Sequence, residues 1–125
     1  MITYTRGKLS KISGVHIETI RFYENEKVLP APARAENGYR LYDERYVLML
    51  SFITEARKLD FSLKEIKDFI SLLFEKQSKT EAEALLNQKI EEINHAIQDL
   101  KKKKAAIQLL SQHTLHDHFT FTTNL

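Results

Sequence analysis

Two stretches set the architecture expected for this chain: TIRFYE at residues 19–24 and NGYRLY at residues 37–42. The first lies in a predicted helix over residues 16–27, which follows a shorter helix over residues 7–12 across a turn that contains Gly14. Two short helices joined by such a turn are typical of a helix-turn-helix. In the second stretch, Asn-Gly favours a type I′ turn and the tyrosines favour strands, so we expect a hairpin. A hairpin attached to a helix-turn-helix is a wing.

Helices are expected throughout the rest of the chain, because all three glycines and both prolines lie in its first third. Asp43 is a suitable N-cap for a helix to residue 58, and Ser62 with Glu65 forms a capping box for the next helix, which reaches about residue 75. The apolar side chains of these two helices are expected to face a core: Val47, Leu48, Leu50, Phe52, Ile53, Ala56, Ile66, Phe69, Ile70, Leu72 and Leu73.

A third helix, expected over residues 80–110 after a polar break, carries a seam of residues at alternating intervals of four and three. This heptad spacing is that of a two-stranded coiled coil, so we expect the chain to form a homodimer. Folding of the stripe back onto the front half of the same chain is the alternative. Lys104 is the polar member of the seam, and its apolar positions are Leu86, Ile90, Ile93, Ile97, Leu100 and Ile107.

These patterns divide the chain into three regions. Residues 1–75 are expected to form a mainly α winged helix-turn-helix domain, residues 79–111 a dimerisation helix, and residues 112–125 a tail that begins as a loop. None of the regions has the apolar stretch of roughly 20 residues that would span a bilayer, and the start lacks the apolar run of a secretory signal. We therefore expect a cytoplasmic protein with no membrane partner.

The composition excludes several kinds of site. The chain has no cysteine, so it forms no disulfide, no thiolate metal site and no cysteine nucleophile. It also contains no glycine-rich phosphate loop, no HExxH motif and no Ser-His-Asp arrangement, so we do not expect an enzyme. Any metal that it binds must be held by nitrogen and oxygen ligands.

Basic side chains gather in the part of the chain that is predicted to carry the wing. Residues 1–58 have a net charge of +3, whereas residues 59–125 have a net charge of −1. Arg21 in the second helix, Arg40 in the hairpin and Arg57 at the end of the following helix are placed to reach phosphates or a minor groove. As a group they favour DNA binding over the alternative, in which they are solvated surface charges and the tyrosines pack the wing.

The two opening stretches, joined by Pro32 and Arg34, closely resemble the MerR family of transcriptional regulators. A later stretch, ARKLDFSLKEI at residues 56–66, is similar to the second helical pair of that family. The resemblance implies a dimer that is joined by an antiparallel coiled coil and binds a pseudo-palindrome within a promoter. It also implies that the dimer kinks and underwinds the DNA, so that RNA polymerase can use promoter elements that are otherwise too far apart.

The resemblance further implies which residues contact DNA. Arg21 and Tyr23 are expected to contact phosphates from the recognition helix, and Arg57 to contact DNA from a second wing. The start of the recognition helix is expected to contact bases, with His16 standing where the family usually has serine or threonine. The full set is His16, Glu18, Thr19, Arg21, Tyr23, Arg34, Asn37, Tyr39, Arg40, Tyr42 and Arg57.

The tail carries candidate metal ligands. Metal-responsive members of the family hold the metal in the loop after the coiled coil, mostly through cysteine, with help from the start of the partner's long helix. Imidazole and carboxylate suit Ni²⁺, Zn²⁺ or Co²⁺, and the tolerance of Ni²⁺ for octahedral nitrogen and oxygen sites places it first. The predicted ligands are His113, His116, Asp117 and His118, completed by Glu81 or Glu83 at the start of the coil helix.

A regulator of the same family without a metal effector is the alternative. Such a protein would be effector-free or would respond to a small molecule, and the three tail histidines would bind nothing. His95, in the middle of the coil helix, is expected to be a surface residue in either case.

Overall fold

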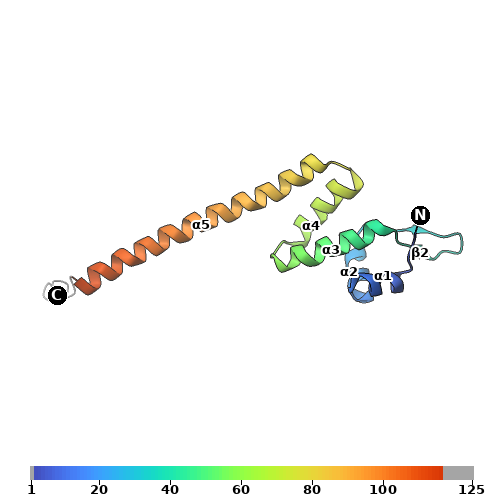
Figure 1. Cartoon of the computed structure of the whole chain (residues 1–125), viewed down its shortest axis with the longest axis horizontal. Helices are drawn as coiled ribbons and strands as arrows, with labels where there is room; N and C mark the ends of the chain where they lie inside the picture. Colours follow the sequence, from blue (N-terminus) through green and yellow to red (C-terminus); the bar gives the residue numbers. More distant parts are fainter. Residues whose placement is uncertain (1, 117–125) are drawn as a thin grey trace. The chain divides into compact units, whose positions relative to one another are not determined.

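The computed structural model describes residues 2–116 (Figure 1). These residues form two units that divide between Glu83 and Ala84. The second unit continues the long helix α5 (Lys79–His116), which starts in the first. Before α5, the first unit contains α1 (Arg6–Ser13), α2 (Ile17–Asn25), β1 (Ala33–Arg34), β2 (Arg40–Leu41), α3 (Glu44–Lys58), α4 (Leu63–Ile70) and the π-helical turn η1 (Ser71–Glu75). The mainly α winged helix-turn-helix predicted from the sequence is confirmed.

The helix-turn-helix has the local chemistry that the sequence suggests. The Thr5 hydroxyl caps α1 by accepting a hydrogen bond from the Lys8 amide, and Gly14 ends the helix at a φ of 74°. Such a left-handed conformation is easy for glycine and costly for residues with a Cβ. His16 occupies the N-cap of α2 but makes no side-chain capping hydrogen bond there.

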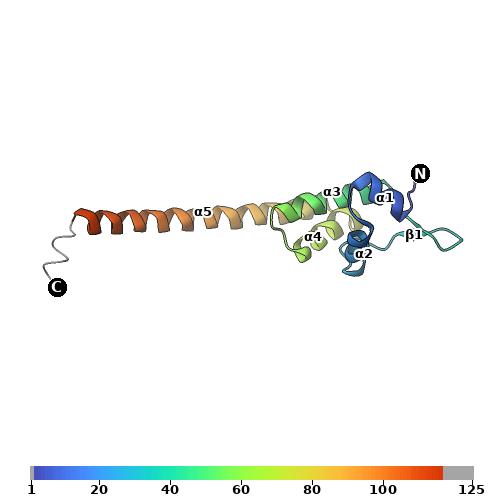
Figure 2. The same cartoon turned by 90° about the horizontal axis from the view of Figure 1, so that it is seen from below.

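The wing is a short antiparallel hairpin that extends away from α1 and α2, as both cartoon views show (Figures 1 and 2). In its turn, the Gly38 amide donates to the Ala35 carbonyl at 2.9 Å and the Ala35 amide donates to the Tyr39 carbonyl at 2.8 Å. Within this turn, φ is positive at Gly38 alone, at 88°. The predicted type I′ turn is therefore wrong: the loop has three residues, and only its last one is left-handed.

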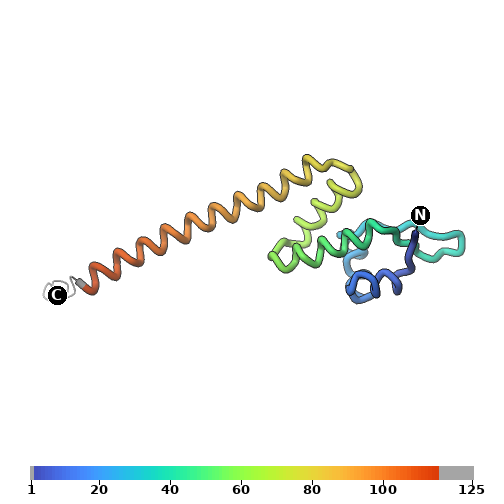
Figure 3. Tube along the Cα trace, in the orientation of Figure 1, coloured from blue at the N-terminus to red at the C-terminus, as the bar shows by residue number. Residues whose placement is uncertain are grey.

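Both predicted caps of the helical pair are present. Asp43 accepts from the Arg45 amide at 2.9 Å, and Ser62 and Glu65 form the capping box reciprocally. The tube view shows the chain reversing between α3 and α4 (Figure 3). The buried core joins these helices to the helix-turn-helix and the wing, and it consists of Leu9, Ile20, Val28, Leu29, Tyr42, Tyr46, Met49, Leu50, Ile53, Ala56, Ile66 and Ile70.

One expected core residue of α3 lies on the surface. Leu48 is 60% exposed, because the buried face of α3 is centred on Met49, Leu50 and Ile53 and Leu48 lies off that face. Val47 and Phe52 are half-buried against the core, and the Phe52 ring stacks on Phe69 of α4 at 4.2 Å between centroids. The predicted apolar stripe is thus confirmed in outline but not at Leu48.

Helix α5 begins two residues after Gln77, whose φ of 52° breaks the preceding helical path. It runs without interruption to His116, so the loop predicted to begin at residue 112 is wrong for residues 112–116. No glycine or proline stands there to end the helix. None of the helices within residues 2–116 combines the length and the apolar character that crossing a bilayer requires.

Candidate nucleic-acid interface

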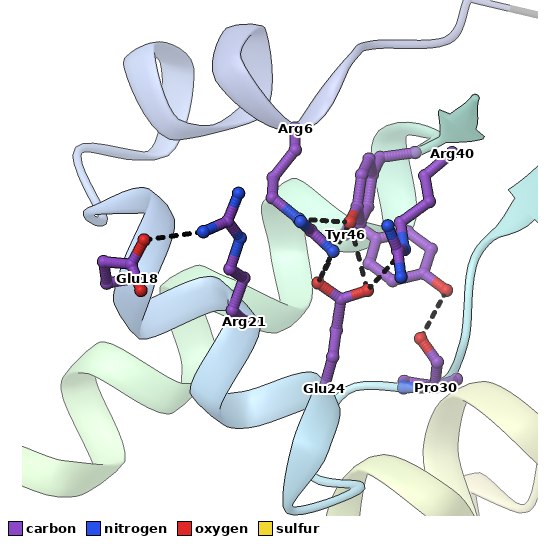
Figure 4. Close-up of polar contacts among 8 residues, drawn as sticks. Arg6, Glu18, Arg21, Glu24, Pro30, Arg40 and Tyr46 are labelled. Carbon is purple, nitrogen blue, oxygen red and sulfur yellow. Dashed lines mark hydrogen bonds and ion pairs between the residues drawn. The ribbon is translucent and has the colours of Figure 1, made fainter.

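The exposed face of α2 carries four of the residues predicted to contact DNA. His16, Glu18 and Arg21 are exposed and Thr19 is half-buried. The Arg21 guanidinium donates to the Glu18 carboxylate at 2.7 Å, as the close-up shows (Figure 4). An exposed ion pair of this kind contributes little to stability, so Arg21 can leave this carboxylate at small cost.

The side chains of the wing turn partly shape the turn itself. Arg34 donates to the Gly38 carbonyl at 3.0 Å, and the Asn37 side-chain oxygen accepts from the Tyr39 amide at 3.2 Å. Both contacts are exposed, so these two residues hold the tip of the wing while they remain open to solvent. The Tyr39 side chain is 70% exposed and offers an aromatic ring and a hydroxyl at the tip.

A charged cluster joins α1, α2 and the wing, and we call its members Arg6, Glu24, Arg40 and Tyr42 the Glu24 cluster. The Glu24 carboxylate accepts hydrogen bonds from Arg6 at 3.1 Å and from the Tyr42 hydroxyl at 3.0 Å. The Arg6 Nε atom also donates to the Tyr42 hydroxyl at 3.0 Å. Arg40 lies with its Nε atom 3.8 Å from Glu24 Oε1 (Figure 4).

The Glu24 cluster is stabilised by charged hydrogen bonds that are partly shielded from solvent. The Glu24 side chain is only 11% exposed, and hydrogen bonds to a charged group are stronger than neutral ones. Burial lowers the pKa of Arg6, but its hydrogen bond to Tyr42 and the charge of Glu24 outweigh that effect and raise the pKa overall. Burial also raises the pKa of Tyr42 above its ordinary value, so its hydroxyl remains a donor.

Tyr42 is one predicted DNA contact that the structure places elsewhere. Its side chain has no exposed surface, and its ring meets that of Tyr46 edge to face at 5.1 Å. Its hydroxyl is used inside the Glu24 cluster, so in this structure the Tyr42 side chain is not open to a DNA phosphate. Tyr23 is half-buried against the core.

Arg57 lies at the end of α3, where the loop before α4 begins. It is exposed, and its guanidinium donates to the Phe61 carbonyl at 3.2 Å. This contact anchors the loop that the resemblance equates with a second wing. Lys58 follows it and pairs with Glu55 at 3.3 Å.

The candidate metal ligands are only partly described. His113 lies exposed on α5, and His116 follows three residues later, a spacing that places both positions on one face of the helix. Asp117 and His118 lie outside the described residues. Glu81 is exposed in the first turn of α5. Within residues 2–116, no three histidine or acidic side chains come together as a metal site.

Sequence reasoning did not assign a role to Arg6 or Glu24. Glu24 shares the inward face of α2 with Ile20 and Tyr23, and a carboxylate at such a position needs buried partners. That signal could have indicated a buried charged contact, but it does not reveal Arg6 and Tyr42, which lie 18 residues before and after Glu24.

The arrangement of α1, α2 and the hairpin defines a winged helix-turn-helix DNA-binding protein. The sequence matches a family described as MerR HTH family regulatory protein over residues 4–73 and one described as MerR, DNA binding over residues 47–110. The chain therefore belongs to the MerR family of transcriptional regulators.

Relatives support the same assignment. The chain is 32% identical over 110 residues to the HTH-type transcriptional regulator ZntR of Escherichia coli K12, covering 86% of this chain and 78% of that protein. The lead(II) complex of PbrR691 from Ralstonia metallidurans CH34 is similar at 32% identity and a TM-score of 0.62, covering 87% and 86% of the two chains. HiNmlR, a MerR family regulator that lacks the sensor domain, is similar in its promoter-bound structure at 28% identity and a TM-score of 0.59, covering 81% and 77%. These relatives are transcription regulators and not enzymes, in agreement with the sequence.

Proposed function

We propose that this regulator binds promoter DNA as an antiparallel homodimer and responds to a divalent metal ion, nickel first and then zinc or cobalt. The observation that carries the proposal is the exposed apolar seam on α5, attached to a winged helix-turn-helix. Ile90, Ile93 and Ile97 are between 42% and 53% exposed. A single chain leaves this stripe in water, and pairing with a second copy would bury it.

Charge favours the antiparallel arrangement of the two copies. The first half of the seam, residues 86–96, carries Glu91 and Glu92 against Lys89, and the second half, residues 97–107, carries four consecutive lysines, residues 101–104, against Asp99. Antiparallel helices place the acidic half of one copy beside the basic half of the other. Parallel helices would instead place four lysines beside four lysines, which like-charge repulsion disfavours.

A dimer of this kind presents two recognition helices and two wings to one duplex. Two-fold symmetry in a protein is matched by a pseudo-palindrome in its DNA site. We expect Arg21, Tyr39 and Arg40 to contact phosphates and His16, Glu18 and Thr19 to face the bases. Distortion of the DNA between the two half-sites would then bring the promoter elements to a spacing that RNA polymerase can use. The regulator would thus control transcription through the deformability of DNA.

The tail residues fit a metal ion by the chemistry of their donors. Histidine and aspartate supply nitrogen and oxygen ligands, which suit Ni²⁺, Zn²⁺ and Co²⁺. His113, His116, Asp117 and His118 would hold the ion, with Glu81 as a further oxygen ligand. The ion would supply a positive charge that fixes the tail, and its removal would release that constraint.

A regulator without a metal effector is the second candidate. The absence of cysteine favours it, and HiNmlR shows that a relative lacking the sensor domain binds promoter DNA. In this case the tail histidines would bind no metal ion, and DNA binding would be independent of added metal.

Three measurements test these proposals in turn. Selection of duplexes from a randomised pool should yield an inverted repeat, and sedimentation should show a dimer at micromolar concentration. A monomer in sedimentation, or equal affinity for selected and random duplexes, would contradict the DNA-binding proposal.

Calorimetry with NiCl₂, ZnCl₂ and CoCl₂ should show metal binding with a dissociation constant below micromolar. His116→Ala and His118→Ala should remove this binding, and His95→Ala should preserve it. If none of the three ions binds, the metal response is rejected and the regulator without a metal effector is the function that remains.

A further inference from the structure

We propose that Glu24 is a positioning residue for DNA binding: it sets the place of Arg40 relative to the recognition helix α2 and so fixes the phosphate contact that Arg40 makes. This inference rests on the proposed DNA-binding function. Glu24 itself lies on the inward face of α2, and its side chain is only 11% exposed. Its effect would pass entirely through Arg40.

The carboxylate of Glu24 is held from two sides. The Tyr42 hydroxyl lies 3.0 Å from each of its oxygens, and Arg6 donates to Oε2 at 3.1 Å. Arg6 also donates to the Tyr42 hydroxyl, so the three groups close a ring of hydrogen bonds. Because each partner is itself held, the carboxylate has a defined position near the end of α2.

Arg40 is oriented by this carboxylate without being enclosed by it. The ion pair joins Arg40 Nε to Glu24 Oε1 at 3.8 Å, and 40% of the Arg40 side chain stays exposed (Figure 4). An arginine side chain has many rotamers, and ordering it costs entropy when a phosphate binds. A carboxylate that orders the side chain beforehand removes part of that cost.

The cluster also connects the two DNA-contacting elements. Arg21 projects from the exposed face of the helix that bears Glu24, and Arg40 belongs to the strand that follows the wing turn. The spacing between these two arginines therefore depends on how Glu24 holds Arg40. A fixed spacing allows both side chains to meet phosphates of one backbone without further adjustment.

Simple electrostatics gives the opposite prediction. Glu24 carries a negative charge near the expected DNA surface, so its neutralisation should by charge alone strengthen the attraction to phosphates. A positioning role predicts that neutralisation weakens binding. The sign of the change therefore separates the two effects.

The test uses the full chain and a labelled duplex selected by the wild-type protein from a randomised pool. Affinity is measured over a series of salt concentrations for wild type, Glu24→Gln, Arg40→Ala and the double variant. Glu26→Gln, an exposed carboxylate just past the end of α2, is the matched control. Circular dichroism and thermal melts report whether each variant is folded.

We expect Glu24→Gln to weaken binding about fivefold, because Arg40 must then be ordered when the phosphate binds, whereas Arg40→Ala removes the contact and should lower the salt slope by about one. In the Arg40→Ala background, the same substitution should change affinity by less than about twofold, because its effect passes through Arg40. Glu26→Gln should keep the wild-type slope.

Tighter binding by Glu24→Gln, or losses that simply add in the double variant, would overturn the inference. If Glu24→Gln fails to fold, Tyr42→Phe takes its place in the same cycle, since it keeps the buried ring and removes only the hydroxyl that holds Glu24. Failure of the wild-type protein to prefer its selected duplex would instead reject the proposed function.

Discussion

The phenol of Tyr46 donates a hydrogen bond of 2.8 Å to the backbone carbonyl of Pro30, across 16 residues of sequence. This contact ties α3 to the segment that leads into the wing (Figure 4). Tyr46 is 4% exposed, and burial raises its pKa from the ordinary value of 10.0 to about 12. The wing is thus attached to the core by a group that must remain protonated.

Alkaline pH should weaken the fold through Tyr46. The phenol of Tyr46 loses its proton near pH 10 in the unfolded chain and near pH 12 in the folded chain. The stability that the protonated phenol contributes is therefore fully present below pH 10 and is lost as the pH rises toward 12. The free energy of unfolding should fall by roughly 2–3 kcal/mol over that window. Urea unfolding at several pH values measures the fall. Tyr46→Phe should lack this component, whereas Tyr39→Phe at the exposed tip should retain it.

Gly14→Ala should destabilise the protein through the backbone alone. Gly14 has a φ of 74°, and a Cβ built there meets nothing within 4 Å, so no clash adds to the conformational cost. We expect a loss of about 1–2 kcal/mol in the free energy of unfolding. Gly7→Ala is the matched control, because it lies inside α1 with open space around it and should stabilise by up to about 1 kcal/mol. Equal effects of the two substitutions would contradict the role given to Gly14.

Arg21→Ala should lower the salt dependence of DNA binding. If Arg21 exchanges Glu18 for a phosphate, its loss should reduce the slope of log affinity against log salt by about one. Lys67→Ala removes an exposed positive charge from α4 and should keep the wild-type slope. A slope that Arg21→Ala leaves unchanged would remove this residue from the interface.

A charge in the middle of the α5 seam should separate the proposed dimer. Ile97→Lys places an ammonium where two apolar stripes would meet, and dimer affinity should fall by at least about a hundredfold. Gln88→Lys adds the same charge at a position on the opposite side of the helix from the seam and should leave the dimer intact. Analytical ultracentrifugation over a concentration series measures both. Dissociation by Gln88→Lys, or no effect of Ile97→Lys, would contradict the proposed seam.

Much of the fold was predictable because its signals are local. Asp43, Ser62 and Gly14 act within one helical turn of their own positions, so residue type and spacing were sufficient to place the helix ends. The wing turn was predicted less well. Asn-Gly suits both a two-residue type I′ turn and a three-residue loop that ends in a left-handed glycine. The hydrogen bond between Ala35 and Tyr39 shows that the loop has three residues.

The sequence predicted which side chains of the candidate site are exposed, but it did not predict which of them are buried. Arg21 and Tyr39 are exposed, as their places in the helix and the turn suggested. Tyr42 looked equivalent to Tyr39 in the sequence, yet it is buried, because strand residues alternate between faces and the inner face meets Tyr46. Residue type alone does not tell which face the core will cover.

Residue order was therefore enough to establish the helix-turn-helix, the wing, the heptad seam and the absence of thiol chemistry, since each depends on neighbours within a few positions. The burial of Tyr42 and the contacts of Glu24 came only from the folded chain. Glu24 meets Arg6 and Tyr42 across 18 residues on either side, and contacts at that separation form only when packing of the core brings α1, α2 and the wing together.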